Sequence, residues 1–132
     1  MRTISSNSTR PRVIGPSGVI SGLFVYGSLG PNAENAHYLA KLSGRWQKAY
    51  ADGRLYPNGL PGTEGYPALD LTDTSTQAKG LLFTSRQLIS RWQVLDDFEG
   101  PAYRRQIIKV RLSNGRHQLA YTYGYCGAES AG

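Results

Sequence analysis

The apolar residues of this 132-residue chain come in short runs that are repeatedly interrupted by glycine and proline. The 16 glycines and 7 prolines leave little room for long amphipathic helices, because both residue types end helices and favour turns. The length is sufficient for one domain with an ordinary hydrophobic core. We therefore expect a single strand-rich α+β domain with tight turns and few helices.

The order of the expected elements narrows the architecture. Helical patterns occur over residues 34–43 and again before residue 100, and Ser113-Asn114-Gly115 reads as a hairpin turn between the last two strands. A curled mixed sheet or small β-barrel with two short helices outside it is the simplest arrangement of these elements. The expected strands are residues 22–26, 45–56, 66–71, 78–83, 103–112 and 118–125.

The net charge of +6 comes partly from the N-terminal segment. Residues 1–20 are polar, rich in serine and free of acidic side chains, so we expect a flexible tail that precedes a domain over residues 21–128. Arg2, Arg10 and Arg12 in that tail account for half of the net charge. The segment also leaves an organelle transit peptide open as an alternative, although it shows no amphipathic periodicity.

The sequence argues against nucleic acid, a membrane and a metal ion as partners of this chain. A basic strand is not accompanied by an aromatic platform or a recognition motif, so nucleic-acid binding is not expected; its basic residues are Arg104, Arg105, Lys109 and Arg111. No run of apolar residues is long enough to span a membrane. Cys126 is the only cysteine, and with His37 and His117 it does not form a zinc-binding pattern, so we expect no metal, no cofactor and a cytoplasmic protein.

The segment Leu95-Asp96-Asp97-Phe98-Glu99-Gly100-Pro101 carries the first functional signal. Apolar residues at helical spacing predict a helix that Thr84 or Ser85 caps and that Gly100 and Pro101 end; they are Leu88, Ile89, Trp92, Leu95 and Phe98. A helix carboxyl end carries a partial negative charge, so each acidic side chain there forgoes roughly 0.3–1 kcal/mol of stabilisation by the helix dipole. The same partial charge favours the protonated form of the carboxyl group. Acidic residues at a position that favours basic ones, without an evident structural gain, indicate a functional role for this segment. The structural alternative is that Asp96 and Asp97 are solvated while Glu99 pairs with Arg104 or Arg105.

The turn Tyr26-Gly27-Ser28-Leu29-Gly30 follows an apolar strand. Its glycines favour unusual backbone conformations and close approach of a ligand, so its N–H groups suit a carboxylate or an oxyanion. Tyr26 stands where a nucleophile elbow needs glycine, and no lysine follows as in a phosphate-binding loop. A plain β-turn is the structural alternative.

Together these segments resemble the γ-glutamylcyclotransferase-like family, which includes γ-glutamylamine cyclotransferases and AIG2-like proteins. The resemblance spans about residues 22–125 and includes the strand and turn around Tyr26, the acidic segment ending at Gly100, and Tyr103-Arg104-Arg105. The segments Gly65-Tyr66-Pro67-Ala68-Leu69 and Lys79-Gly80-Leu81-Leu82-Phe83 are similar to its middle strands.

The resemblance implies a small mixed barrel with a pocket between the turn and the acidic helix end. It implies that Glu99 is the general acid and base, and that the substrate binds Tyr26, Gly27, Ser28, Leu29, Tyr103 and a later tyrosine, Tyr123 or else Tyr121. The implied reaction is intramolecular aminolysis of a γ-glutamyl amide, which releases 5-oxoproline and a free amine without a cofactor. Gly30-Pro31 departs from the family pattern, in which a basic residue and a later glycine are common.

Alternatives to this enzyme stay open at the level of sequence. One is a binding module of the same fold that takes a carboxylate or γ-glutamyl ligand without catalysis, and a weaker one is a basic adaptor for nucleic acid. The leaving amine is open between a lysine side chain, an amino acid, the remainder of glutathione and an antibiotic precursor. The sequence does not indicate the oligomeric state.

Overall fold

The computed structural model describes residues 20–27, 29–30 and 33–127, and it contains a closed mixed barrel. Strands β1 (Gly22–Val25), β5 (Gln77–Thr84), β2 (Arg45–Asp52), β6 (Tyr103–Leu112) and β7 (His117–Tyr125) pair in that order. The consecutive pairs are antiparallel, and a parallel contact of Leu23 with Tyr121 joins β7 back to β1. The fold class expected from the sequence is confirmed; the expected N-terminal tail, apart from Ile20, lies outside the described residues.

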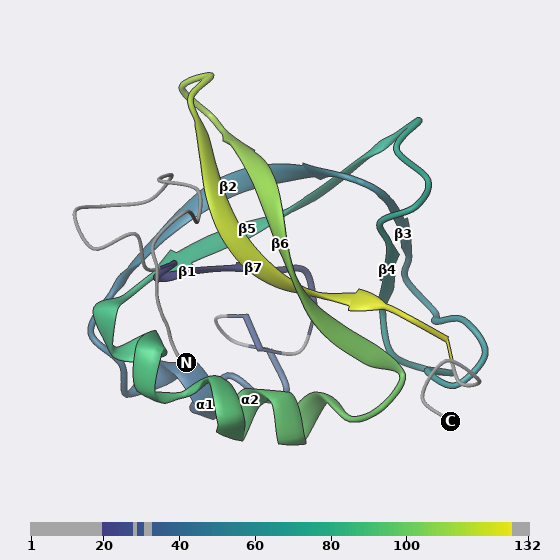
Figure 1. Cartoon of the computed structure of the whole chain (residues 1–132), viewed down its shortest axis with the longest axis horizontal. Coiled ribbons are helices and arrows are strands. Elements are labelled where there is room, and N and C mark those ends of the chain that lie inside the picture. The colour runs from purple at the N-terminus through teal and green to yellow at the C-terminus, as the bar shows by residue number, and fades with distance from the viewer. Residues whose placement is uncertain (1–19, 28, 31–32, 128–132) are drawn as a thin grey trace, which may run out of the picture.

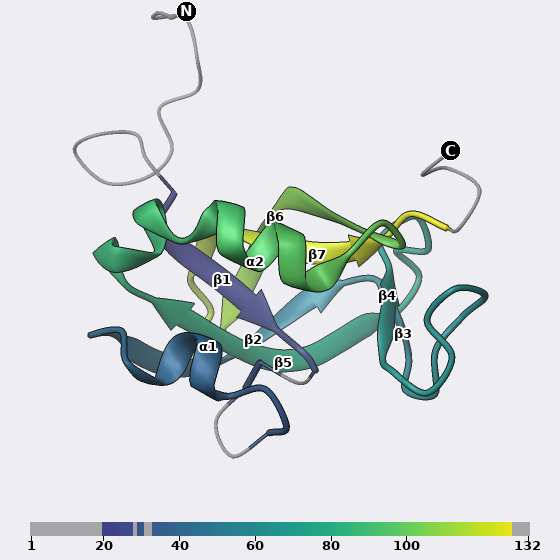
Figure 2. The same cartoon turned by 90° about the horizontal axis from the view of Figure 1, so that it is seen from below.

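The short helices α1 (His37–Ala40) and α2 (Trp92–Glu99) lie on the same side of the barrel, as the two views in Figures 1 and 2 show. Strand β1 is consequently buried on both faces, and this explains its uninterrupted apolar sequence. Phe24 packs in the barrel interior with small side chains such as Ala49 and Ala120, whereas Leu23 and Val25 pack against residues of the helical layer.

The expected strand over residues 45–56 is in fact two strands. Gly53 interrupts it, donating its N–H to the carbonyl oxygen of Thr76 at 2.9 Å, and the chain then leaves the barrel. The next strand, β3 (Arg54–Tyr56), pairs with β4 (Ala68–Asp70) in a separate two-stranded sheet, seen to one side of the barrel in Figure 1. The expected strand at 66–71 is thus shorter than predicted.

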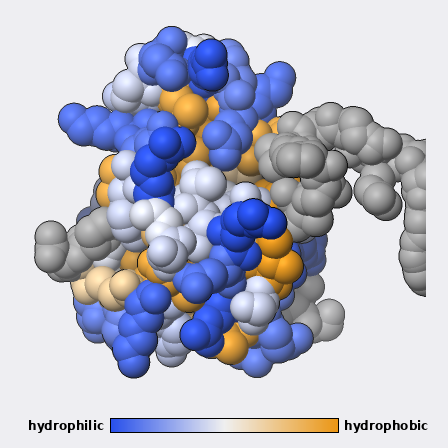
Figure 3. All heavy atoms as spheres, turned by 90° about the vertical axis from the view of Figure 1, so that its left-hand side faces the viewer, coloured by the Kyte–Doolittle hydropathy of each residue, from blue (hydrophilic) through white to orange (hydrophobic). Residues whose placement is uncertain are grey.

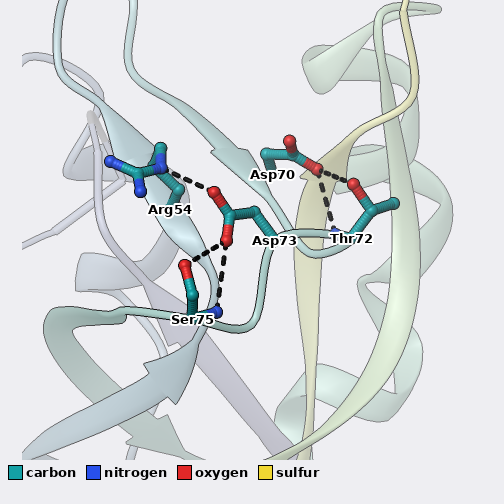
Figure 4. A network of polar contacts seen from close by, with 5 residues as sticks. All are labelled: Arg54, Asp70, Thr72, Asp73 and Ser75. Carbon is teal, nitrogen blue, oxygen red and sulfur yellow. Dashed lines mark hydrogen bonds and ion pairs between the residues drawn. The ribbon is translucent and has the colours of Figure 1, made fainter.

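The β3–β4 sheet is fastened by polar contacts in the turn that follows it. Asp73 accepts hydrogen bonds from the Nε of Arg54 at 2.6 Å and from the hydroxyl group of Ser75 at 2.6 Å, as Figure 4 shows. Asp70 binds the hydroxyl group and backbone N–H of Thr72 in the same way, at 2.6 and 2.9 Å. These turn-forming residues explain why the polar segment 72–76 reverses the chain.

The helix expected before Gly100 is divided into a 3₁₀ helix at Arg86–Ser90 and the α-helix α2. Ser85 caps the first part, as predicted, by accepting a hydrogen bond from the N–H of Gln87 at 3.1 Å. The division places Leu88 in the core but leaves Ile89 49% exposed, so Ile89 does not belong to the buried face. Gly100 ends α2 as predicted, with a φ of 82° that favours glycine.

Two other expectations concern α1 and the last hairpin. The helix expected over residues 34–43 is reduced to α1, because no side chain caps its N-terminus and the flanking residues form turns. The hairpin between β6 and β7 is confirmed, with Gly115 at a φ of 89° and the N–H of Leu112 bonded to the carbonyl oxygen of Arg116 at 2.8 Å.

The outside of the molecule is largely polar on the face drawn in Figure 3, where apolar side chains lie scattered among hydrophilic ones. Within the described ranges, no helix has the length and apolar character needed to cross a membrane.

Candidate functional site

A cavity of about 420 Å³ lies where the ends of β1 and α2 meet the loop that joins β3 to β4. Gly27 and Leu29 contribute to its wall from the turn after β1, Glu99 from the last residue of α2, and Tyr103 and Tyr123 from β6 and β7. The structure therefore brings the turn and the acidic helix end together around one space. Its volume lies in the range of about 300–1,000 Å³ that is usual for small-molecule sites.

Glu99 is the half-buried carboxylate of this cavity. Burial raises the pKa of its carboxyl group to about 7, because the charged form is poorly solvated there. Among the described residues none forms an ion pair with Glu99; the ion pair at this helix end instead joins the Nε of Arg105 to Asp96 at 2.9 Å. The alternative in which Arg104 or Arg105 neutralises Glu99 is therefore wrong.

The three acids at the end of α2 thus meet three different environments. Asp97 is exposed and accepts a hydrogen bond from the Nε2 of Gln93, one turn earlier, at 3.1 Å. Burial opposes the ionisation of Asp96, but hydrogen bonds from Arg105 and Tyr123 outweigh it and lower the pKa of that carboxyl group. Only Glu99, of these three, faces the cavity.

Three tyrosines surround Glu99, and its charge is among the causes that raise the pKa of each, after burial as the largest. Tyr26 donates its hydroxyl proton to the carbonyl oxygen of Tyr123, and Tyr103 donates to that of Pro67 at 2.7 Å. Tyr123 lines the cavity, whereas Tyr121 packs its ring against Trp92, with centroids 4.8 Å apart. The geometry thus distinguishes the two tyrosines between which the sequence left a choice.

The turn after β1 differs in one respect from the expectation. Neither Gly27 nor Gly30 has a positive φ, so the backbone conformation does not itself require glycine at these positions. A Cβ atom on Gly27 would lie 3.6 Å from the ring of Pro67, at ordinary contact distance, and Pro67 also lines the cavity. Neither the backbone conformation nor close packing therefore requires glycine at position 27. Ser28, the central predicted residue, lies outside the described residues.

Sequence reasoning missed part of the cavity wall. Glu34 and Asn35 contribute to it from the segment after the turn, and Thr63 and Tyr66 contribute from the β3–β4 loop. No sequence signal marked Glu34, whose single carboxylate lies in an ordinary turn. The charged side chains on the described wall, Glu34 and Glu99, are both acidic, so an anionic ligand group there depends on neutral donors.

A metal centre is not indicated by the described side chains. They include no group of three histidine, cysteine or acidic residues placed to hold an ion. His37 lies in α1 and His117 at the start of β7, and Cys126 donates its thiol to the carbonyl oxygen of Pro101 at 3.2 Å.

The chain is similar to several solved structures. It resembles YkqA from Bacillus subtilis with 25% identity and a TM-score of 0.63, covering 83% of this chain but only 37% of YkqA. It resembles an AIG2-like protein from Mus musculus with 18% identity and a TM-score of 0.62, covering 81% of this chain and 78% of that protein. A third structure, described as a gamma-glutamyl cyclotransferase, has 17% identity and a TM-score of 0.61, with 80% and 66% covered.

A comparison with curated proteins finds no significant match. The sequence model of one family, described as "Gamma-glutamyl cyclotransferase, AIG2-like", matches residues 23–132, and this range contains every described residue of the cavity wall. The barrel, the cavity between the first turn and the acidic helix end, and this match agree: the chain belongs to the AIG2-like gamma-glutamyl cyclotransferase family.

Proposed function

We propose that the protein is a γ-glutamyl cyclotransferase that converts a γ-glutamyl amide into 5-oxoproline and a free amine, with Glu99 as general acid and base. The observation that carries the proposal is a cavity-facing carboxyl group whose pKa burial raises to about 7. The substrate's α-ammonium group lies beside its own carboxylate, so its pKa lies above the ~7.7–8.0 of a peptide N-terminus, and a base with a raised pKa accepts its proton at a smaller cost in free energy than an ordinary glutamate.

The reaction is balanced without any external reactant. The Glu99 carboxylate takes a proton from the substrate's α-ammonium group, and the freed amine nitrogen attacks the γ-carbonyl carbon. The resulting tetrahedral intermediate expels the amine as the C–N bond breaks, and protonated Glu99 gives its proton to the leaving nitrogen. The restored Glu99 carboxylate then takes the remaining extra proton from the ring nitrogen and passes it to the released amine, so that 5-oxoproline and the amine in its ammonium form are the products. Because nucleophile and electrophile belong to one molecule, holding the substrate in its folded conformation contributes several kcal/mol more.

Substrate binding is assigned to the cavity wall. Backbone N–H groups of the Gly27–Leu29 turn hold the α-carboxylate or polarise the γ-carbonyl group, and Tyr26, Tyr103 and Tyr123 enclose the glutamyl moiety. Neutral donors are needed for the α-carboxylate because the charged side chains on the described wall are acidic. The substrate is a small γ-glutamyl compound, no cofactor takes part, and the single cysteine in the sequence favours the cytoplasm.

The decisive experiment measures 5-oxoproline released from a panel of γ-glutamyl amides by the wild-type protein, Glu99→Gln and Asp97→Asn. We expect turnover by the wild type and by Asp97→Asn, because Asp97 is an exposed acid of the same helix that does not line the cavity. Glu99→Gln should lose activity by a factor on the order of 10²–10⁴ while still binding the substrate. Binding without any 5-oxoproline from the wild type would instead indicate a non-catalytic module of this fold.

A further inference from the structure

One carboxylate of α2 is not used by the proposed reaction but is connected to the cavity wall. Asp96, one helical turn before Glu99, accepts the hydroxyl proton of Tyr123 at 2.6 Å. The same carboxylate accepts hydrogen bonds from the Nε and an Nη nitrogen of Arg105, at 2.9 and 3.2 Å. Asp96 therefore links a cavity-lining tyrosine to a cation outside the cavity wall.

Arg105 is itself fixed in place by two aromatic rings. Its guanidinium carbon lies 4.9 Å from the ring centroid of Trp92 and 4.5 Å from that of Tyr121, within the range of cation–π contacts. Two parallel hydrogen bonds from a guanidinium group to a carboxylate also define its orientation. Asp96 is thus held in its ionised form and at a defined position.

This arrangement determines what Tyr123 presents to a ligand. A tyrosine hydroxyl group has a single proton, and in Tyr123 that proton is directed at Asp96 rather than into the cavity. The oxygen lone pairs remain, so towards a ligand in the cavity that Tyr123 lines, the hydroxyl group can act only as an acceptor. Burial and the hydrogen bond to Asp96 both raise the pKa of Tyr123, in agreement with a hydroxyl group that does not release its proton.

We propose that Asp96, supported by Arg105, is a positioning residue that keeps the Tyr123 hydroxyl group as a hydrogen-bond acceptor for an N–H group of the substrate. The inference rests on the proposed cyclotransferase function and deepens it. A γ-glutamyl amide offers two such donors, the α-ammonium group and the N–H of the scissile amide. Proton transfer is left to Glu99, and Tyr123 orients the nitrogen that gives up or receives the proton.

The test is a double-mutant cycle on kcat/KM with Tyr123→Phe, Asp96→Asn and their combination, and with Asp97→Asn as the matched control on the same helix. Tyr123→Phe should lower kcat/KM about tenfold in the wild-type background, the size of one hydrogen bond to a charged or polar group. It should lower kcat/KM less than twofold when Asp96 is already Asn, because Asp96 acts through Tyr123. Equal losses in both backgrounds, or wild-type kcat/KM in Asp96→Asn, would overturn the inference.

Asp96→Asn leaves a half-buried arginine without its partner, so loss of folding has to be separated from loss of positioning. The same cycle is therefore run in Asp96→Asn/Arg105→Gln, which removes both charges together, and the thermal midpoint of each variant is recorded. Wild-type release of 5-oxoproline in this assay tests the proposed function by itself. If the wild type is inactive, the cycle is measured on the Kd of a γ-glutamyl amide by calorimetry, where the same non-additivity supports the inference and additive losses or absence of binding overturn it.

Discussion

Tyr103 donates its hydroxyl proton to the carbonyl oxygen of Pro67 at 2.7 Å and so ties the first residue of β6 to the end of the β3–β4 loop. Tyr125 makes an equivalent bond to the carbonyl oxygen of Pro61 at 2.6 Å. Two tyrosines thus hold a loop that forms one wall of the cavity but belongs to a sheet outside the barrel.

Tyr103→Phe should loosen that wall without removing the ring. We expect KM for a γ-glutamyl amide to rise several-fold and the free energy of unfolding to fall by about 0.5–1.5 kcal/mol, the usual effect of one lost hydrogen bond. Tyr50→Phe is the control, because the Tyr50 ring contacts Arg111 on β6 and does not line the cavity. Steady-state kinetics and urea unfolding check both; an unchanged KM in Tyr103→Phe would contradict the role of the loop.

The pH dependence of activity should follow the ionisation of Glu99. Because the proposed base must be ionised to accept the substrate's proton, kcat/KM should rise with pH and level off above about 7. An ordinary glutamate, with a pKa near ~4.3, would give a profile already flat at pH 6. A pH–rate series between pH 5 and 9 with a γ-glutamyl amide measures the limb directly.

Stability should change in the opposite direction over the same range. The folded pKa of Glu99 is raised from 4.5 to about 7, so the folded state binds more protons than the unfolded state between these values. The contribution of Glu99 to stability is therefore greatest below the lower value and falls as pH rises towards the upper one, by up to about 3 kcal/mol.

Glu99→Gln removes this titration. We expect the variant to be more stable than the wild type at pH 8 and of similar stability at pH 4, as measured by chemical denaturation at both pH values. A variant that is equally destabilised at both would show that Glu99 contributes to the fold through a contact instead.

Gly100 offers a test of how strictly the end of α2 must be defined. Both Gly100 and Gly115 have a positive φ, of 82° and 89°, and a Cβ atom on either would meet nothing within 4 Å. Alanine at either position should therefore cost a similar backbone strain, about 1–2 kcal/mol. Only Gly100→Ala should also lower kcat/KM, because Gly100 follows Glu99 whereas Gly115 lies in the β6–β7 turn. Equal activities would contradict this.

The sequence predicted those parts of the fold that local rules determine. The Asn114-Gly115 turn and the Gly100 stop both require a positive φ, and both were predictable from residue type. The break at Gly53 was not, because the chain departs there to form β3, whose residues pair with residues of β4 that lie 12 to 16 positions later in the sequence. Likewise, Ile89 fitted the helical period, and only the 3₁₀ segment turned it outward.

In the candidate site, too, local sequence rules predicted some features, whereas others depend on tertiary packing. Glu99 was predictable as a site residue because the helix dipole disfavours an acid at a helix carboxyl end. The hydrogen-bond partner of each acid was not predictable, because it depends on the packing of β6 and β7 against α2. The sequence suggested Arg104 or Arg105 as a partner for Glu99, but Arg105 pairs with Asp96 because Trp92 and Tyr121 hold its guanidinium group there. Thr63 contributes to the cavity wall only because the β3–β4 sheet forms, and no local sequence pattern predicted that sheet.

The contact of β1 with β7 joins the two ends of the domain: the hydroxyl group of Thr122 donates to the carbonyl oxygen of Phe24 at 3.0 Å, and Tyr26 donates to Tyr123. Contacts between residues so far apart in sequence form late and slow the folding of a chain. A chain emerging from the ribosome therefore has no complete binding site until its last strand docks. A molecule that fills the cavity contacts both ends of the domain and binds only the folded state, so its binding should raise the melting temperature of the whole barrel.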